Sequence, residues 1–311
     1  MNIAKVHFFR ARSIVLLAAL LAVATFSPTG ATTKIIPGTA KQVETNVAAA
    51  AKVTKLTKAQ VSQLATASSD AFANLAAGTQ CLHITSCHFG PTSPKSTAVI
   101  LGDSHAMAWT PAILPGLLAR GYGVSLLAMG ACTPATLEIT MAIYNYPKLC
   151  DEFRTSALAE IAAAHPSLVL VAEKVNLGGS GDPLSPAQWQ QGLETTLSQL
   201  KAPKTKVAII EDVPKFPWDL PNCLAQHPTS VQQCQIAAGA VPDPLFRAAE
   251  RQAAVATSVS FLPTRKWFCA TKCSPMIAGN IVFYDGQHLS KSYGIYLSTV
   301  MADALKPLLT K

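Results

Sequence analysis

The stretch TAVILGDSH, residues 97–105, decides the fold class of this chain. In its first five residues, Thr97 is followed by the uninterrupted apolar run Ala98–Leu101, which is typical of a strand buried on both faces of a parallel sheet. Gly102 ends the run, and Ser104 follows in the loop that we expect after the strand. A serine hydroxyl is a weak nucleophile until a base removes its proton, so Ser104 is a catalytic candidate only if the chain supplies that base.

The tetrapeptide DGQH, residues 285–288, can supply the base. At an i, i+3 offset opening a helix, Asp285 and His288 lie on one face. The carboxylate can then hold one imidazole nitrogen while the other nitrogen faces the serine. The sequence therefore predicts a catalytic site made of Ser104, His288 and Asp285. Either motif alone has a simpler interpretation, because loop serines and aspartates often cap the next helix.

Apolar runs and helical periodicities alternate along the rest of the chain. We expect strands at 97–101, 123–129, 168–172, 206–210 and 259–262, and helices at 108–119, 153–164, 186–200, 245–255 and 293–308. This alternation predicts an α/β fold, a three-layer α/β/α sandwich around a five-stranded parallel sheet. Ligands bind such sheets outside the carboxyl ends of the strands, where Ser104 is expected.

The N-terminus is typical of a secretory signal peptide over residues 1–31. Basic residues precede an uncharged apolar run at 14–26, and small residues follow at Gly30 and Ala31. The run is shorter than the ~20 residues of a membrane span, so we favour cleavage near Ala31 over an uncleaved N-terminal anchor. We therefore expect an exported protein that is secreted, periplasmic or attached to the cell surface.

Composition and charge exclude some classes of function. The formal net charge is +8, and cleavage of residues 1–31 removes three positive charges and no negative ones, which leaves +5. No dense basic patch is interleaved with aromatic residues, so we do not expect nucleic-acid binding. No metal or other cofactor is predicted.

Three regions are expected along the chain. After the signal peptide, residues 32–95 form a spacer and an N-terminal helical arm that ends in a cysteine-bearing loop. Within it, 32–55 is rich in Ala, Thr, Lys and Val, which indicates a flexible or weakly helical spacer, and 57–77 has helical spacing. The catalytic domain is expected over residues 96–311.

An even number of cysteines behind an export signal indicates disulfides. We predict four sequential pairs, because each closes a short loop outside the expected core elements: Cys81–Cys87, Cys132–Cys150, Cys223–Cys234 and Cys269–Cys273. A zinc site is the alternative for the first pair, since His83 and His88 lie beside these two cysteines. The disulfide is favoured, because these four residues are very close in sequence and the expected compartment is oxidising.

The order of the motifs resembles the SGNH, or GDSL-like, hydrolase superfamily. It is most similar to the SGNH domain that follows the membrane acyltransferase-3 domain in bacterial O-acyltransferases, over residues 56–308. The matching blocks are GDSH at 102–105, MGACTP at 129–134 and YDGQHL at 284–289, with a further likeness from Trp267 through Cys273 to Asn280. The resemblance implies a flavodoxin-like sandwich with Ser104 as nucleophile, Asp285 and His288 in the triad, and an oxyanion hole lined by the amides of Ser104 and Gly130.

A third oxyanion donor is less well marked. The superfamily often places an asparagine after the third strand, in a Gly-x-Asn form that this chain lacks. Asn176 is the candidate, and a loop residue at a turn is its alternative. Loss of one oxyanion donor lowers the rate by about 10²–10³, so the question concerns efficiency rather than reaction type.

Other residues are predicted to support the loops of the site or to bind the substrate. His105 is a structural neighbour or a substrate contact and not the base, and Asp103 braces its loop by hydrogen bonds. Trp218, with Phe216 and Pro217, forms either an aromatic wall for a sugar or an acyl chain, or a loop anchored by its aromatic residues.

We therefore expect a serine esterase or O-acyltransferase. The resemblance implies that it acts on acyl esters, acetyl above all, of cell-envelope carbohydrate, either alone or with a separate membrane protein as acyl donor. The ordinary α/β-hydrolase fold fits less well, because Ala106 occupies the last glycine position of its Gly-x-Ser-x-Gly elbow. The alternative is a non-catalytic SGNH-like envelope module that binds acylated glycan.

Overall fold

The computed structural model describes residues 35–72, 87–137, 146–175, 184–239 and 244–309. These residues belong to one compact unit that spans 35–311. The expected signal peptide, 1–31, lies outside the described residues. Within the described ranges, none of the helices has the length and apolar character needed to cross a bilayer.

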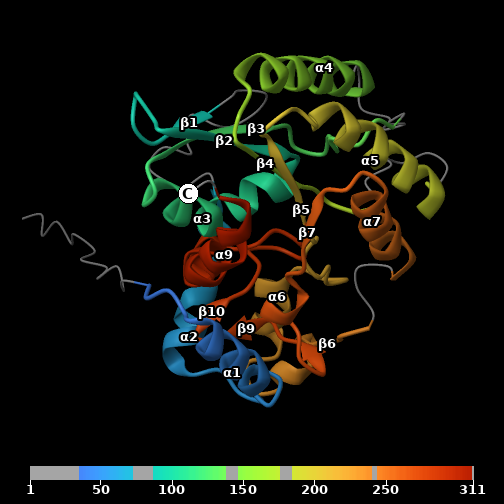
Figure 1. The fold of residues 1–311 in the computed structure, drawn as a ribbon. Helices are drawn as coiled ribbons and strands as arrows, with labels where there is room; N and C mark the ends of the chain where they lie inside the picture. The colour runs from blue at the N-terminus through green and yellow to red at the C-terminus, as the bar shows by residue number, and fades with distance from the viewer. Residues whose placement is uncertain (1–34, 73–86, 138–145, 176–183, 240–243, 310–311) are drawn as a thin grey trace, which may run out of the picture. The chain divides into compact units, whose positions relative to one another are not determined.

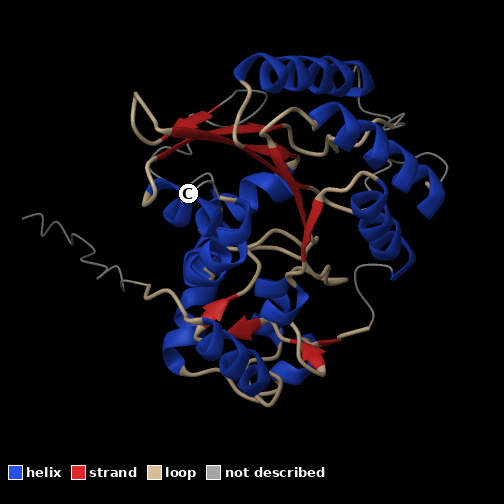
Figure 2. Ribbon diagram, viewed as in Figure 1, coloured by secondary structure: helices blue, strands red, loops and turns tan. Residues whose placement is uncertain are grey.

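A six-stranded sheet forms the centre of this unit (Figures 1 and 2). Its strands, in spatial order, are β1 (Cys87–Phe89), β3 (Tyr122–Ala128), β2 (Ser96–Gly102), β4 (Leu168–Ala172), β5 (Lys206–Ile210) and β7 (Ser260–Leu262). All neighbours pair in parallel except β1, which pairs antiparallel with β3. The predicted α/β class is confirmed, and all five expected strands form. The added sixth strand is a three-residue edge segment.

Helices cover both faces of the sheet (Figure 1). One face carries α3 (Ser104–Leu118), α8 (Lys291–Tyr296) and α9 (Ser298–Leu305), and the other carries α4 (Tyr146–Ala164), α5 (Pro186–Leu200) and α7 (Pro244–Ala256). Successive residues of β2 alternate between two apolar cores, with Ile100 packed on the first side and Leu101 on the second. This is the alternation that the pleat of a strand imposes.

The strand order places Ser104 at a special point of the sheet. The chain runs from β2 outward to β3 on one side, and then crosses to β4 on the other side of β2. Open parallel sheets bind their ligands at this reversal, beyond the carboxyl ends of the strands. Ser104 is the first residue of α3, and Asp103 alone separates it from this end of β2.

Several short elements lie between β5 and α8 in the chain. They are α6 (Leu220–Gln226), β6 (Ile236–Ala237), β8 (Lys272–Cys273), β9 (Met276–Ile277) and β10 (Asn280–Ile281). The last two form a small antiparallel pair, as do β6 and β8.

The N-terminal arm differs from the sequence expectation. Within the segment expected to be a spacer, residues 40–50 form helix α1 (Ala40–Ala50), whose N-terminus is closed by a capping box between Thr39 and Gln42. Val43 and Val47 of this helix are buried in the core shared with α9. Tertiary packing therefore overrides the weak local signal. The helix expected at 57–77 is shorter, with α2 spanning Lys58–Leu64 and a 3₁₀ turn at Ala67–Ser69.

Candidate active site

Ser104 is placed by the junction between β2 and α3. Asp103 is the N-cap of α3, and its Oδ1 accepts a hydrogen bond from the backbone amide of His105 at 2.7 Å. The amide of Ser104 belongs to the first turn of the helix, whose amides have no partner within the helix and favour negative charge. This junction therefore presents both a hydroxyl and an anion-stabilising amide at the carboxyl edge of the sheet.

Asp285 and His288 lie in a turn before α8, whereas the sequence placed them at the opening of a helix. Asp285 Oδ1 accepts hydrogen bonds from the backbone amides of Gln287 at 2.8 Å and His288 at 2.7 Å. The amide of Tyr284 donates to the carbonyl of His288 at 3.1 Å and closes the turn. An aspartate that binds nearby amides favours a turn over a helix, which explains the difference.

The fold brings these three side chains together. His288 Nε2 lies 2.7 Å from Ser104 Oγ, and His288 Nδ1 lies 2.6 Å from Asp285 Oδ2. Burial opposes ionisation of Asp285, but the hydrogen bonds and charge of His288, with two backbone amides, outweigh it and lower the pKa of this carboxyl. An ionised carboxylate can hold Nδ1 as the donor and leave Nε2 as the acceptor toward the serine.

The turn of Asp285 is fixed against the loop that follows β5. The amide of Phe216 donates to the carbonyl of Gly286 at 2.7 Å, and the amide of Leu220 donates to that of Asp285 at 3.1 Å. A Cβ at Gly286 would lie 2.7 Å from the carbonyl oxygen of Trp218, so only glycine permits this approach. The backbone contacts therefore set the position of the turn.

The two aromatic residues of this loop have different environments. Phe216 is buried and packs on Phe283, with ring centroids 5.7 Å apart. Trp218 is 36% exposed and lies next to the turn that carries Asp285 and His288. Phe216 thus anchors the loop, while a substrate-binding role for Trp218 stays a prediction.

Gly130 lies at the same edge of the sheet as Ser104. Gly102 of β2 pairs in register with Ala128 of β3, and Ser104 and Gly130 each stand two residues beyond that pair. A Cβ built at Gly130 would meet nothing within 4 Å, so open space adjoins this backbone. Asn176, the expected third oxyanion donor, lies outside the described residues.

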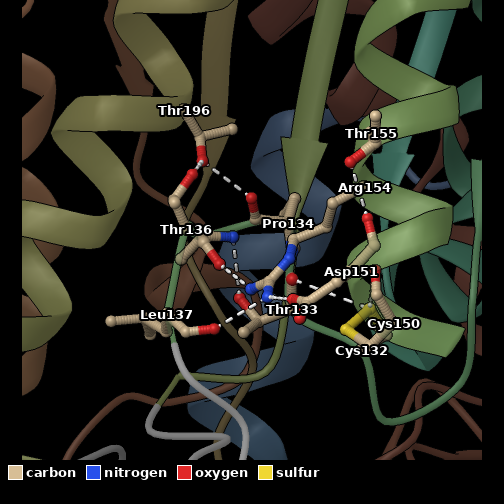
Figure 3. Close-up of polar contacts among 11 residues, drawn as sticks. Cys132, Thr133, Pro134, Thr136, Leu137, Cys150, Asp151, Arg154, Thr155 and Thr196 are labelled. Carbon is tan, nitrogen blue, oxygen red and sulfur yellow. Dashed lines mark hydrogen bonds and ion pairs between the residues drawn. A yellow bond between two sulfur atoms is a disulfide. The ribbon is translucent and has the colours of Figure 1, made fainter. Parts of the chain in front are cut away.

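The loop that carries Gly130 is braced from α4 and α5 (Figure 3). A disulfide joins Cys132 in the loop to Cys150 in α4. The Arg154 guanidinium donates to the carbonyls of Ala135 at 2.5 Å and Leu137 at 2.7 Å. These bonds restrain the loop, and preorganised donors are what an oxyanion site requires.

His105 is buried, and the structure shows a partner for it that the sequence analysis missed. The residue is 2% exposed, and its Nδ1 lies 2.5 Å from Oδ1 of Asp212, which follows β5. This burial favours the structural role, and the substrate contact considered for His105 stays a prediction. Asp212 stands two residues after the apolar strand β5, at the same sheet edge as Ser104, and that position was a signal available in the sequence.

Other buried carboxylates join the loops at this edge. Asp103 Oδ2 accepts from the amide of Lys174 at 2.9 Å, so Asp103 braces the loops after β2 and β4 as predicted. Burial raises the pKa of Asp103, although the charge of His105 and the two amides counteract it. After β4, Glu173 accepts a hydrogen bond from the hydroxyl of Thr133 in the Gly130 loop.

Glu173 makes the stability of the protein depend on pH. Burial raises its pKa to about 8, although the hydrogen bond from Thr133 favours the charged form. In the unfolded chain the pKa of a glutamate is ~4.3. The folded state therefore holds a proton that the unfolded state has lost, so this stabilisation is present below the unfolded value and is lost as pH rises through about 8.

We expect Glu173→Gln to flatten this dependence. Thermal unfolding midpoints measured from about pH 5 to about pH 8 should fall less in the variant than in the wild type, since glutamine has no proton to lose. Glu160→Gln, on the exposed side of α4, serves as the control and should follow the wild type. Parallel curves for Glu173→Gln and wild type would contradict the assignment.

Three of the four disulfides expected from the sequence lie within the described residues. The structure joins Cys132 to Cys150, Cys223 to Cys234, and Cys269 to Cys273. Cys81 of the fourth pair lies outside the described residues, as does His83 of the alternative zinc site. Among the residues described, no group of three or more His, Cys, Asp or Glu side chains is arranged to hold a metal ion.

Comparisons with known proteins agree with this architecture. The model of the SGNH domain family, in the form fused to AT3 domains, matches residues 42–303. The lipopolysaccharide acetyltransferase periplasmic domain of Salmonella ser. Paratyphi A has a similar structure, with a TM-score of 0.53 and 16% identity over 68% of this chain and 83% of that one. A carbohydrate acetylesterase from Sinorhizobium meliloti matches with a TM-score of 0.45 and 19% identity over 69% of this chain and 100% of that one. No curated protein is significantly similar to the sequence.

Proposed function

This chain belongs to the family of SGNH domains that are found fused to AT3 domains, and from that membership we propose that it is an exported serine esterase or O-acyltransferase acting on acetyl esters of cell-envelope carbohydrate. The observation that carries the proposal is the pair of hydrogen bonds from Ser104 to His288, at 2.7 Å, and from His288 to Asp285, at 2.6 Å. This is the arrangement that activates a serine hydroxyl.

The proposed reaction proceeds through an acyl-enzyme. Ser104 Oγ attacks the ester carbonyl carbon while His288 Nε2 takes its proton, and Asp285 stabilises the imidazolium. The amides of Ser104 and Gly130, with Asn176 as a third donor, stabilise the tetrahedral oxyanion. His288 then protonates the leaving alcohol, and the intermediate collapses to an acyl-serine. A water molecule or a carbohydrate hydroxyl, deprotonated by the same imidazole, releases the acyl group.

The substrate class and the compartment are supported by other observations. The Salmonella domain of similar fold comes from a lipopolysaccharide acetyltransferase, which suggests acetyl esters of envelope carbohydrate for this chain. The disulfides suit an oxidising compartment. The proposed signal peptide at 1–31 accounts for export, and a separate membrane protein is the proposed acyl donor if the reaction is a transfer.

A fluorophosphonate probe tests the nucleophile directly. We expect one labelled serine, Ser104, identified by peptide mass spectrometry, and no labelling of Ser104→Ala. Ser125 provides a matched control, because its hydroxyl also lies 2.9 Å from an imidazole nitrogen, that of His88. Ser125→Ala should label like the wild type. Absent labelling together with measurable binding of acetylated glycan would favour the non-catalytic module.

A product analysis separates hydrolysis from transfer. The protein is incubated with p-nitrophenyl acetate, with and without an oligosaccharide acceptor. Free acetate as the product in both reactions indicates an esterase, whereas acetylated oligosaccharide that requires Ser104 indicates a transferase. Turnover that Ser104→Ala retains would remove the assigned nucleophile.

A further inference from the structure

The imidazole of His288 contacts two other rings besides its hydrogen-bond partners. Tyr284 stacks on it, with centroids 5.4 Å apart and ring planes 10° apart. His105 meets it edge to face, with centroids 5.2 Å apart and planes 68° apart. Such contacts restrict the torsion about which an imidazole turns, so these neighbours bear on whether Nε2 faces Ser104.

His105 is itself held rigidly. Its Nδ1 lies 2.5 Å from Asp212 Oδ1, and the two side chains are 3% and 5% exposed. Asp212 in turn accepts hydrogen bonds from the backbone amides of Val213 at 2.7 Å and Val175 at 2.9 Å. The ring beside His288 is thus anchored to the loops that follow β4 and β5.

The geometry excludes His105 as a second general base. Its Nδ1 is occupied by Asp212, and its Nε2 is buried and has no hydrogen-bond partner within the described residues. The Ser104 hydroxyl already faces His288. His105 therefore contributes to the site through the contact between its ring and the ring of His288.

We propose that the His105–Asp212 pair is a positioning pair, which holds the imidazole of His288 in the orientation that faces Ser104. This inference rests on the proposed function. It gives His105, the residue after the nucleophile Ser104, a role that acts through the base His288. His105 places its ring against His288, and Asp212 fixes that ring through Nδ1. Neither residue touches the reacting atoms.

Three variants separate the ring from the hydrogen bond. His105→Asn keeps an N–H that can reach Asp212 but removes the ring beside His288. His105→Phe combined with Asp212→Asn restores a ring without leaving a buried, unpaired carboxylate. Thr110→Val is the control, because Thr110 is a buried polar residue of the same helix whose hydroxyl donates to the carbonyl of Ala106.

We expect His105→Asn to lower kcat for p-nitrophenyl acetate about tenfold, the upper range for an edge-to-face ring contact, with KM within about twofold of wild type. The double variant should recover part of the lost kcat, and Thr110→Val should match the wild type. A kcat loss in Thr110→Val equal to that of His105→Asn would assign the effect to general loosening of α3 and overturn the proposal.

Proton NMR tests, independently of turnover, whether His105 holds the imidazole of His288 in place. The short hydrogen bond between His288 Nδ1 and Asp285 should give a low-field proton resonance, assigned by its absence in His288→Gln. We expect this resonance to broaden or vanish in His105→Asn and to persist in Thr110→Val. An intact resonance and unchanged kcat in His105→Asn would overturn the positioning role and leave the proposed function standing. A wild-type protein that the probe does not label would instead overturn the function, while the resonance would still report whether His105 holds His288.

Discussion

Ser104→Ala should lower kcat by about 10⁶, and adding His288→Ala to it should lower kcat no further. In the proposed mechanism the two side chains share one proton transfer across the 2.7 Å contact between Oγ and Nε2, so either removal should abolish the same step. The residual rate should still exceed the uncatalysed reaction by about 10³–10⁴, because the amides of the proposed oxyanion site remain. Steady-state hydrolysis of p-nitrophenyl acetate by the wild type, Ser104→Ala, His288→Ala and the double variant measures these changes in kcat.

Asp285→Asn should have a smaller effect, about 10⁴ in kcat, because asparagine cannot hold the imidazole in the required tautomer or stabilise its charge. Ser125→Ala, which disrupts a serine–histidine contact without a carboxylate, should leave kcat unchanged. If the losses of Ser104→Ala and His288→Ala multiplied in the double variant, the two residues would act in separate steps and the proposed acyl-enzyme mechanism would fail.

The strands that carry the site could be predicted from the sequence. Each expected strand forms within one residue of its predicted ends, because a buried parallel strand is a short apolar run that ends in turn residues. The edge strand β1 was missed, since three residues among cysteines, prolines and a glycine resemble a loop. Helix α1 was missed for a different reason, because its stability comes from burying Val43 and Val47 against distant helices.

The meeting of Ser104 with His288 could be anticipated from the order of the motifs, but the surroundings of the two residues could not. His105 and Asp212 are 107 residues apart, and no spacing rule connects them. They meet because the ends of β2, β4 and β5 converge on one edge of the sheet. Sequence reasoning places acids after strands, but it does not indicate which of them will be buried and share a partner.

That convergence depends on how closely β2 and β4 approach at their carboxyl ends. Gly102 pairs in register with Ala172, and a Cβ at Gly102 would lie 1.8 Å from the carbonyl oxygen of Ala172. A contact below 3 Å with backbone forces the strands apart, because a carbonyl within a ladder has no room to move. Asp103, the next residue, bonds the amide of Lys174 in the loop after β4 and needs the same approach.

We therefore expect Gly102→Ala to destabilise the fold by about 4 kcal/mol or more, or to prevent soluble expression. Denaturant unfolding followed by circular dichroism measures the loss. Gly239→Ala is the matched control, because a Cβ there meets nothing within 4 Å, and its unfolding curve should overlie that of the wild type. A Gly102→Ala protein of native stability would mean that β2 and β4 can separate without a loss of free energy. The close approach of these two strands would then not be what holds the loops of the site together.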